Sequence, residues 1–174
     1  MTGAQGPGTP PQEVVERALA LSKTDGCVVL VEEVTGANLR WAANTLTTNG
    51  IERGREVTVV AIAGESAGVV SRQGVTDGSL EDLVRAAEHA AQSAPPADEA
   101  MPLVRGRPAG GDWGAPPAET SIAVFSGFAE ALGEAFRRAA ASEQLLFGFA
   151  EHEMRTTYAG SSAGMRARHD QPTG

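Results

Sequence analysis

The run of β-branched and small apolar residues at positions 57–62, VTVVAI, constrains the fold of this chain more than any other feature. Such a run is typical of a strand that is covered on both faces or lies in the middle of a sheet. Asn49-Gly50 and Arg53-Gly54-Arg55 precede it, and these residues tolerate the positive φ of tight connections. Residues 40–63 therefore predict a strand, a turn and a second strand, around which the rest of the chain is organised.

Other strand patterns lie on both sides of this run. Residues 27–34, CVVLVEEV, predict a strand because β-branched residues dominate, and Thr35-Gly36-Ala37 then predicts a turn. Residues 38–43 and 45–51 predict a strand pair or one long bent strand, and a short strand is expected near residues 68–71. The connections are too short for a parallel crossover, so we predict an antiparallel meander.

Two amphipathic helices flank these strands. The first is expected to begin near Thr9 and Gln12, which have the spacing of a capping box, and to end near Lys23. The second is expected to begin at Ser79, to carry acidic residues in its first turn, and to end by Ser93. The predicted fold class is therefore α+β, with two helices covering one face of an antiparallel sheet.

Composition divides the chain into four parts. Residues 1–10 are rich in Gly and Pro and predict a mobile leader, and residues 11–93 predict the α+β domain. Residues 94–117 predict a Pro/Gly-rich linker, in which Trp113 is expected to pack back onto a core. Residues 118–174 predict the start of a second α+β domain: a helix to about residue 141, a strand at 145–158, a turn at 159–164 and a returning strand at 165–169.

This last part predicts an incomplete unit, because a helix and one hairpin do not bury all their own apolar surface. Leu145, Phe147 and Phe149 alternate onto one strand face, where we expect them to cover the helix. The opposite strand face and the strand edges would then lack a cover. The prediction is self-association or a mobile C-terminal part.

Charge and composition exclude several classes of protein. The net charge of −8 argues against nucleic-acid binding, which depends on clustered Lys and Arg, and the short Arg groups are expected on solvated faces or turns. No segment predicts a signal peptide or a membrane span. The single cysteine, Cys27, fits a reducing compartment and is expected to be a buried thiol without catalytic role. We therefore predict a cytoplasmic protein.

The densest set of ionisable residues is Glu151-His152-Glu153, together with His169 and Asp170. Successive strand residues point to opposite faces, so His152 would oppose the two glutamates, although His152 or Glu153 could approach His169 across the hairpin. A polar strand face is favoured over a metal site. His89 is expected to face solvent.

Two glycine-containing segments also lack the context of a catalytic or phosphate site. Ser161-Ser162 lies in a turn between two strands and not in the strand-elbow-helix of a nucleophile, and residues 106–111 lack the Lys-Ser/Thr of a phosphate loop. The sequence predicts no catalytic, cofactor-binding or metal-binding residue in this chain.

Two segments carry a resemblance to a known family. NLRWAANTLTTNG at residues 38–50 and LFGFAEHEMRTTYAGSSAGMRARHDQPTG at residues 146–174, with the order of elements above, resemble the N-terminal part of the TldD/PmbA family, a modulator-of-DNA-gyrase family. The terminal segment is similar to the start of that family's second region in high-GC Gram-positive bacteria. The resemblance covers nearly the whole chain after Pro10.

The resemblance implies a metallopeptidase context. Family members are commonly several hundred residues long, and their peptidases carry zinc on an HExxxH-type helix in a later domain. His152-Glu153 does not complete that motif, because Thr156 and Thr157 stand where a second His would be needed. The family also implies peptide substrates and a role in gyrase-inhibitor control or peptide maturation. It further implies pairing with a homologous or identical subunit, and in some of these pairs one subunit lacks the metal site.

The leading hypothesis is therefore the N-terminal, non-catalytic portion of such an enzyme. The alternatives are a non-catalytic partner subunit, or a module that binds peptides by β-strand addition.

Overall fold

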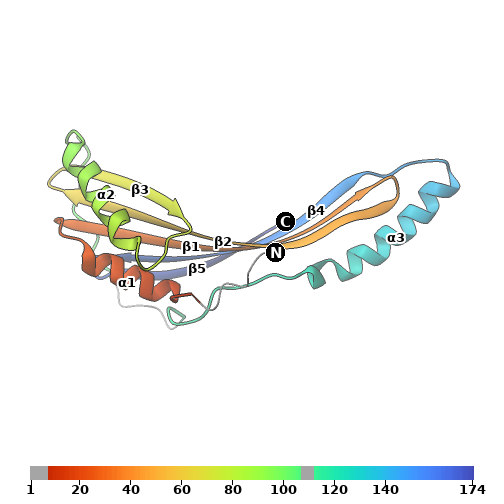
Figure 1. The fold of residues 1–174 in the computed structure, drawn as a ribbon, viewed down its shortest axis with the longest axis horizontal. Helices are drawn as coiled ribbons and strands as arrows, with labels where there is room; N and C mark the ends of the chain where they lie inside the picture. The colour runs from red at the N-terminus through yellow and green to blue at the C-terminus, as the bar shows by residue number, and fades with distance from the viewer. Residues whose placement is uncertain (1–7, 107–111) are drawn as a thin grey trace. The chain divides into compact units, whose positions relative to one another are not determined.

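The computed structural model describes residues 8–106 and 112–174 (Figure 1). Its elements, in chain order, are α1 (Pro11–Leu21), β1 (Gly26–Ala42), β2 (Thr45–Ala63), β3 (Ser66–Gln73), α2 (Leu80–Ser93), the 3-10 turn η1 (Ile122–Phe125), α3 (Ser126–Ala141), β4 (Gly148–Ser161) and β5 (Arg166–Thr173). The strands form one five-stranded antiparallel sheet in the order β3-β2-β1-β4-β5. This confirms the predicted α+β fold class. Of the predicted leader, residues 1–7 lie outside the described residues.

The first two strands are longer than predicted. The predicted turn at Thr35-Gly36-Ala37 is wrong, because these residues continue β1, with Thr35 and Ala37 buried. Asn49-Gly50 and Arg53-Gly54-Arg55 likewise lie inside β2, and neither glycine has a positive φ. The chain reverses instead at Ala43 and Asn44, whose φ angles of 49° and 59° suit a two-residue hairpin turn.

Grouping the described residues by spatial proximity gives two compact units. Unit 1 is drawn from residues 1–33, 54–116 and 156–169, and unit 2 from residues 34–53, 117–155 and 170–174. Four strands, β1, β2, β4 and β5, contribute residues to both units. The contiguous division predicted from composition, 11–93, 94–117 and 118–174, stays a prediction about domains.

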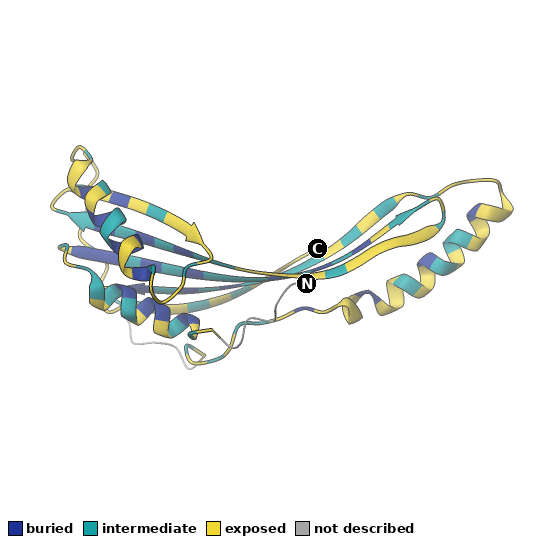
Figure 2. Ribbon diagram, viewed as in Figure 1, coloured by how far each residue is buried: buried dark blue, intermediate teal, exposed yellow. Residues whose placement is uncertain are grey.

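Unit 1 has the main hydrophobic core, where α1 and α2 cover one face of the sheet (Figure 2). Tyr158 from β4 is fully buried there, and its hydroxyl donates a hydrogen bond of 2.7 Å to the Ala115 carbonyl. Trp113 packs against this core, as predicted, with its ring centroid 5.8 Å from that of Tyr158. The fully buried aliphatic residues come from both helices and from alternate positions of β1 and β2: Val15, Ala18, Val29, Val31, Val57, Val59, Ala61, Leu83, Val84, Ala87 and Ala91.

The helix starts differ in detail from their predictions. The capping box at Thr9 and Gln12 is wrong: the Thr9 hydroxyl donates to Asp77 at 2.8 Å, and the Gln12 amide donates to the carbonyls of Trp113 and Ala115. Ser79 precedes α2 as predicted, but its hydroxyl oxygen accepts from the Thr76 backbone N–H instead of capping the helix. Thr9 and Gln12 thus bind residues far away in the sequence, and Ser79 binds a residue before its helix, so none of the three side chains caps a helix.

Unit 2 has a smaller core between α3 and its part of the sheet. Phe125 and Leu132 pack with Ala37 and Leu39 of β1, and the Trp41 ring lies 5.7 Å from the ring of Phe128. These contacts bury Phe125 and Leu132, whereas Phe128 stays 42% exposed.

The expected face of β4 is reversed. Leu145, Phe147 and Phe149 were expected to cover α3, but they are 62, 65 and 64% exposed, while Ala150 packs against the core. Gly148 explains the difference, because a Cβ there would lie 2.5 Å from the Trp41 ring. The chain therefore turns its small residues towards the large aromatic ring and its phenylalanines outwards.

Candidate functional site

A cavity of about 550 Å³ lies in unit 1 beside the first residues of β3, and we name it the β3 cavity. Its volume lies within the range of ordinary ligand pockets. Four separate stretches of chain line it: Asp25 and Gly26; Ile62 and residues 64–67; Ala97 and residues 100–103; and Ser162 and Ala163.

Two hydrogen bonds hold the segment 94–103, which follows α2, against the turn between β2 and β3. The Ala97 N–H donates to the Glu65 carbonyl at 2.9 Å, and the Ser66 hydroxyl donates to the Ala94 carbonyl at 3.0 Å. Gly64, with φ of 60°, makes the turn, and its N–H donates to the Asp25 carboxylate at 2.8 Å. The wall of the cavity is thus held by one backbone hydrogen bond and two hydrogen bonds between a side chain and the backbone.

The lining combines apolar surface with negative charge. Ile62 and Leu103 both lie beside Gly26, where an added Cβ would be 3.3 and 3.1 Å from them. The charged residues of the lining are Asp25 and Glu65, and both are acidic. Such a site can hold an apolar group that is attached to a cation. No sequence pattern indicates this cavity, because its lining residues are far apart along the chain.

The ionisable residues His152 and Glu153 of the C-terminal hairpin each have a separate partner. His152 Nδ1 and the Thr120 hydroxyl share a hydrogen bond of 2.8 Å, and Glu153 forms an ion pair of 3.2 Å with Arg155. No group of three or more His, Cys, Asp or Glu residues that could hold a metal ion occurs in the described part of the chain. The described residues therefore do not fit zinc, which takes three or four protein ligands.

The cysteine and the two serines have structural contacts. Cys27 is 1% exposed, and burial raises the pKa of its thiol, so it is a poor nucleophile. Ser162 and Cys27 exchange two hydrogen bonds: the Ser162 N–H donates to the Cys27 carbonyl, and the Ser162 hydroxyl accepts from the Cys27 N–H. The Ser161 hydroxyl accepts from the Met165 N–H inside the turn.

The remaining candidate residues have no catalytic partner among the described residues. His89 on α2 is exposed, as expected. Of the glycine-rich segment 106–111, residues 107–111 lie outside the described residues, and the Gly106 N–H donates to the Ala163 carbonyl.

Glu88 of α2 is a buried carboxylate that the sequence did not reveal. Its side chain accepts a hydrogen bond of 2.6 Å from the Lys23 N–H and pairs with Arg85, which also donates to the Leu21 carbonyl. Burial would raise the pKa of Glu88, but these bonds outweigh it and lower the pKa. The stability that this group contributes is therefore present above the ordinary glutamate pKa and is lost as the pH falls through the folded value.

A second half-buried pair joins Glu33 of β1 to Arg55 of β2. The Arg55 Nε lies 2.5 Å from the Glu33 carboxylate, and another nitrogen of Arg55 donates to the Thr9 carbonyl. Burial raises the pKa of Glu33, and the charge of Arg55 offsets part of that effect. Arg55 was expected in a turn on a solvated face, so its place within the sheet is a correction.

Two more arginines expected on a solvated face have structural roles on β5. Arg166 binds both carboxylate oxygens of Glu16, at 2.6 and 2.7 Å, which raises the pKa of Arg166 and lowers that of Glu16. The guanidinium of Arg168 lies 5.7 Å from the centre of the Tyr158 ring and donates to the Pro116 carbonyl. Both side chains tie β5 to other parts of unit 1, Arg166 through Glu16 and Arg168 through Asp112, which lies 3.6 Å away.

Part of the chain matches a known protein family. Residues 27–94 match the sequence model of a family described as PmbA/TldA metallopeptidase domain 1. The chain is related to the N-terminal portion of the TldD/PmbA family. This confirms the resemblance found in the sequence. A search of curated proteins gives no significant match.

Solved structures of similar fold carry names from the same family. TldE from Thermococcus kodakarensis superposes with a TM-score of 0.69 at 11% identity, over 92% of this chain and 36% of its own. A putative modulator of DNA gyrase from Bacteroides thetaiotaomicron gives 0.66 at 10% identity, over 92% and 38%. A putative modulator of a DNA gyrase from Thermotoga maritima gives 0.61 at 15% identity, over 92% and 37%.

At these identities the structural likeness establishes the fold. The chain spans little more than a third of the length of these neighbours. None of its described helices has the length and apolar character needed to cross a membrane.

Proposed function

We propose that this chain is the N-terminal, non-catalytic portion of a cytoplasmic TldD/PmbA-like metallopeptidase that acts in proteolysis or peptide maturation. The match of residues 27–94 to the first domain of that metallopeptidase family carries the proposal. The separate partners of His152 and Glu153 support a non-catalytic role, because His152 bonds to Thr120 while Glu153, the next residue of the strand and therefore on the other face, pairs with Arg155. Zinc would be held by a further region, as in the catalytic members that the resemblance implies.

Incubation of the purified chain with zinc and unfolded peptides tests this proposal. We expect no hydrolysis, because the described residues offer no zinc ligand set. His89→Ala serves as the control for His152→Ala, since His89 is an exposed histidine in the other unit. Zinc-dependent turnover that is lost with His152→Ala and kept with His89→Ala would contradict the proposal.

A second candidate function is a non-catalytic partner subunit or a peptide-binding module that acts by β-strand addition. The observation in its favour is that β3 and β5 lie at the two ends of the strand order. An edge strand has backbone groups that an added strand can pair with. Sequencing the open reading frame beyond residue 174 distinguishes the candidates. A continuation that encodes a His-Glu-x-x-x-His helix favours the enzyme, and a continuation without such a helix favours the partner subunit. A stop codon after residue 174 favours the peptide-binding module.

We further propose that the partner is a homologous or identical subunit, which covers the apolar surface at the start of β4. Three large side chains within five positions, Leu145, Phe147 and Phe149, are more than 60% exposed. Surface of this kind is usually buried in an assembly.

Sedimentation velocity over a range of concentrations tests this assembly. We expect the chain to associate, and Phe147→Ser with Phe149→Ser to shift it to the monomer. Val69→Ser is the matched control, because Val69 is equally exposed, at 61%, but lies in unit 1. A monodisperse monomer with strong amide protection across residues 145–169 would refute the proposal.

A further inference from the structure

The β3 cavity continues onto an open apolar face of the sheet. Gly68 of β3 faces α2, because a Cβ there would lie 2.2 Å from the Ala91 nitrogen. Its neighbours Ala67 and Val69 therefore face the opposite side, since successive strand residues alternate. They pair across the strands with Ile62 and Val60. Ala67 and Ile62 line the cavity, and Val69 extends the same face along β3 with 61% of its surface exposed.

The free edge of β3 lies next to this face. β3 is the last strand in the order β3-β2-β1-β4-β5, and it pairs with β2 from residue 66 to residue 73. An extended peptide could add to its outer edge by main-chain hydrogen bonds. Such a peptide would present every second side chain to the face that carries Ala67 and Val69.

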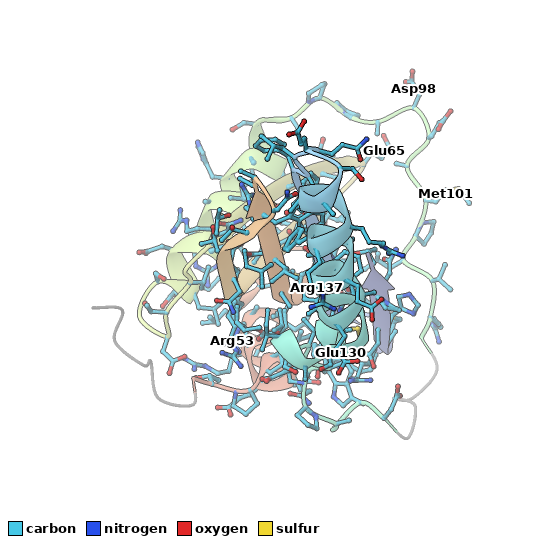
Figure 3. All side chains as sticks on the ribbon, turned by 90° about the vertical axis from the view of Figure 1, so that its right-hand side faces the viewer. Arg53, Glu65, Asp98, Met101, Glu130 and Arg137 are labelled. Atoms are coloured by element: carbon cyan, nitrogen blue, oxygen red, sulfur yellow. The ribbon has the colours of Figure 1, made fainter. Side chains whose placement is uncertain are left out.

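The charges around the β3 cavity indicate which kind of peptide would bind there. Glu65 belongs to the turn that leads into β3, and it lines the cavity together with Ala67 and Asp25. Asp98, on the segment that borders the cavity, is also exposed, and Figure 3 shows it with Glu65 and Met101. No Lys or Arg belongs to the cavity lining. The potential there favours a cation next to an apolar group.

We propose that the β3 cavity and the edge of β3 bind an extended peptide in which an apolar residue and a Lys or Arg stand two positions apart. The apolar side chain enters the cavity between Ile62 and Leu103, and the cation pairs with Asp25 and Glu65. This inference rests on the strand-addition candidate above and adds to it the site and the class of peptide. A peptide is favoured over a small amine because the edge of β3 offers backbone partners that an amine cannot use.

Fluorescence anisotropy with two labelled peptides tests the inference on the full chain. The probes are the fluorescein-labelled, capped peptides Thr-Leu-Thr-Lys-Thr and Thr-Leu-Thr-Glu-Thr. We expect the lysine peptide to bind more tightly, and its affinity to fall with added salt. Equal binding of the two peptides would overturn the charge assignment.

Two matched double variants locate the site. Asp25→Asn with Glu65→Gln removes the two acidic groups while leaving an oxygen at residue 25 to accept from the Gly64 N–H. Glu81→Gln with Asp82→Asn removes the same charge from exposed residues of α2 and is the control. We expect the cavity variant to weaken lysine-peptide binding about tenfold, because it removes two partly exposed ion pairs with the peptide. The control removes charges far from the cavity and is expected to change binding less than about twofold.

The apolar contact has its own variant, and the outcomes separate the claims. Leu103→Ala is expected to weaken binding of both peptides, with circular dichroism confirming that the fold is kept. If the peptide binds but all variants bind alike, strand addition stands and the β3 cavity is not the site. If neither peptide binds, both the inference and strand addition fail, whereas the metallopeptidase proposal depends on the separate turnover assay. If hexylamine competes as well as the peptide, the ligand is an amine and the peptide assignment is overturned.

Discussion

Replacing Gly68 with alanine is expected to separate α2 from β3 and to lower the free energy of unfolding of unit 1 by about 3 kcal/mol, at the upper end for overpacked sites. The new Cβ would lie 2.2 Å from the Ala91 nitrogen and 2.4 Å from the Ala87 carbonyl oxygen. Both atoms belong to the helix backbone, so no side-chain rotation relieves the clash. Ala87 and Ala91 are fully buried, which shows how closely the helix approaches the strand.

Urea unfolding followed by circular dichroism and tryptophan fluorescence measures this effect. In a Trp41→Phe background the remaining tryptophan is Trp113, which packs against the core of unit 1. Gly78→Ala is the control, because an added Cβ at Gly78 meets no atom within 4 Å. Equal midpoints for Gly68→Ala and Gly78→Ala would mean that α2 does not lie this close to β3.

The sequence predicted the helices of this fold better than the strand ends. The apolar stripe of α2 follows a 3.6-residue period through Leu83, Val84, Ala87 and Ala91, and the structure buries all four. Residues 35–37 and 49–55 were predicted as connections because Gly and Asn are frequent in turns. In β1 and β2 these glycines have ordinary extended backbone angles, since neighbouring strands supply the hydrogen bonds that local composition cannot indicate.

The candidate site was less accessible to prediction than the fold, because its contacts join distant residues. The hydrogen bond between Thr120 and His152 spans 32 positions, and that between Cys27 and Ser162 spans 135. Sequence reasoning placed His152 on a polar strand face but had no means to find its partner. The β3 cavity depends on a segment after α2 that the sequence predicted only as a linker.

The same limitation explains the reversed face of β4. Alternation along residues 145–150 gives two possible faces, and the choice depends on what lies across the sheet. The larger apolar side chains, Leu145, Phe147 and Phe149, were expected to cover α3. The structure has the opposite arrangement, because the ring of Trp41 in β1 occupies the space next to Gly148.

Gly148→Ala is therefore expected to destabilise unit 2 by about 2 kcal/mol, because overpacking forces a neighbouring side chain out of its position. The added Cβ would lie 2.5 and 2.8 Å from two ring atoms of Trp41. The Trp41 ring can move, unlike a helix backbone, so we expect a smaller loss than for Gly68→Ala. Its displacement would break the contact with Phe128, whose ring centroid is 5.7 Å away.

Fluorescence of Trp41 reports this displacement directly when Trp113 is replaced by Phe, because the chain has two tryptophans. In that background Gly148→Ala is expected to shift the emission to longer wavelength and to lower the unfolding midpoint in urea. Gly133→Ala on α3 is the matched control, since an added Cβ there meets nothing within 4 Å. Alanine is the better helix former, so the control is expected to stabilise α3 by up to about 1 kcal/mol. An unchanged emission spectrum and midpoint for Gly148→Ala would show that Trp41 does not lie over Gly148, and the reversed face of β4 would then lose its explanation.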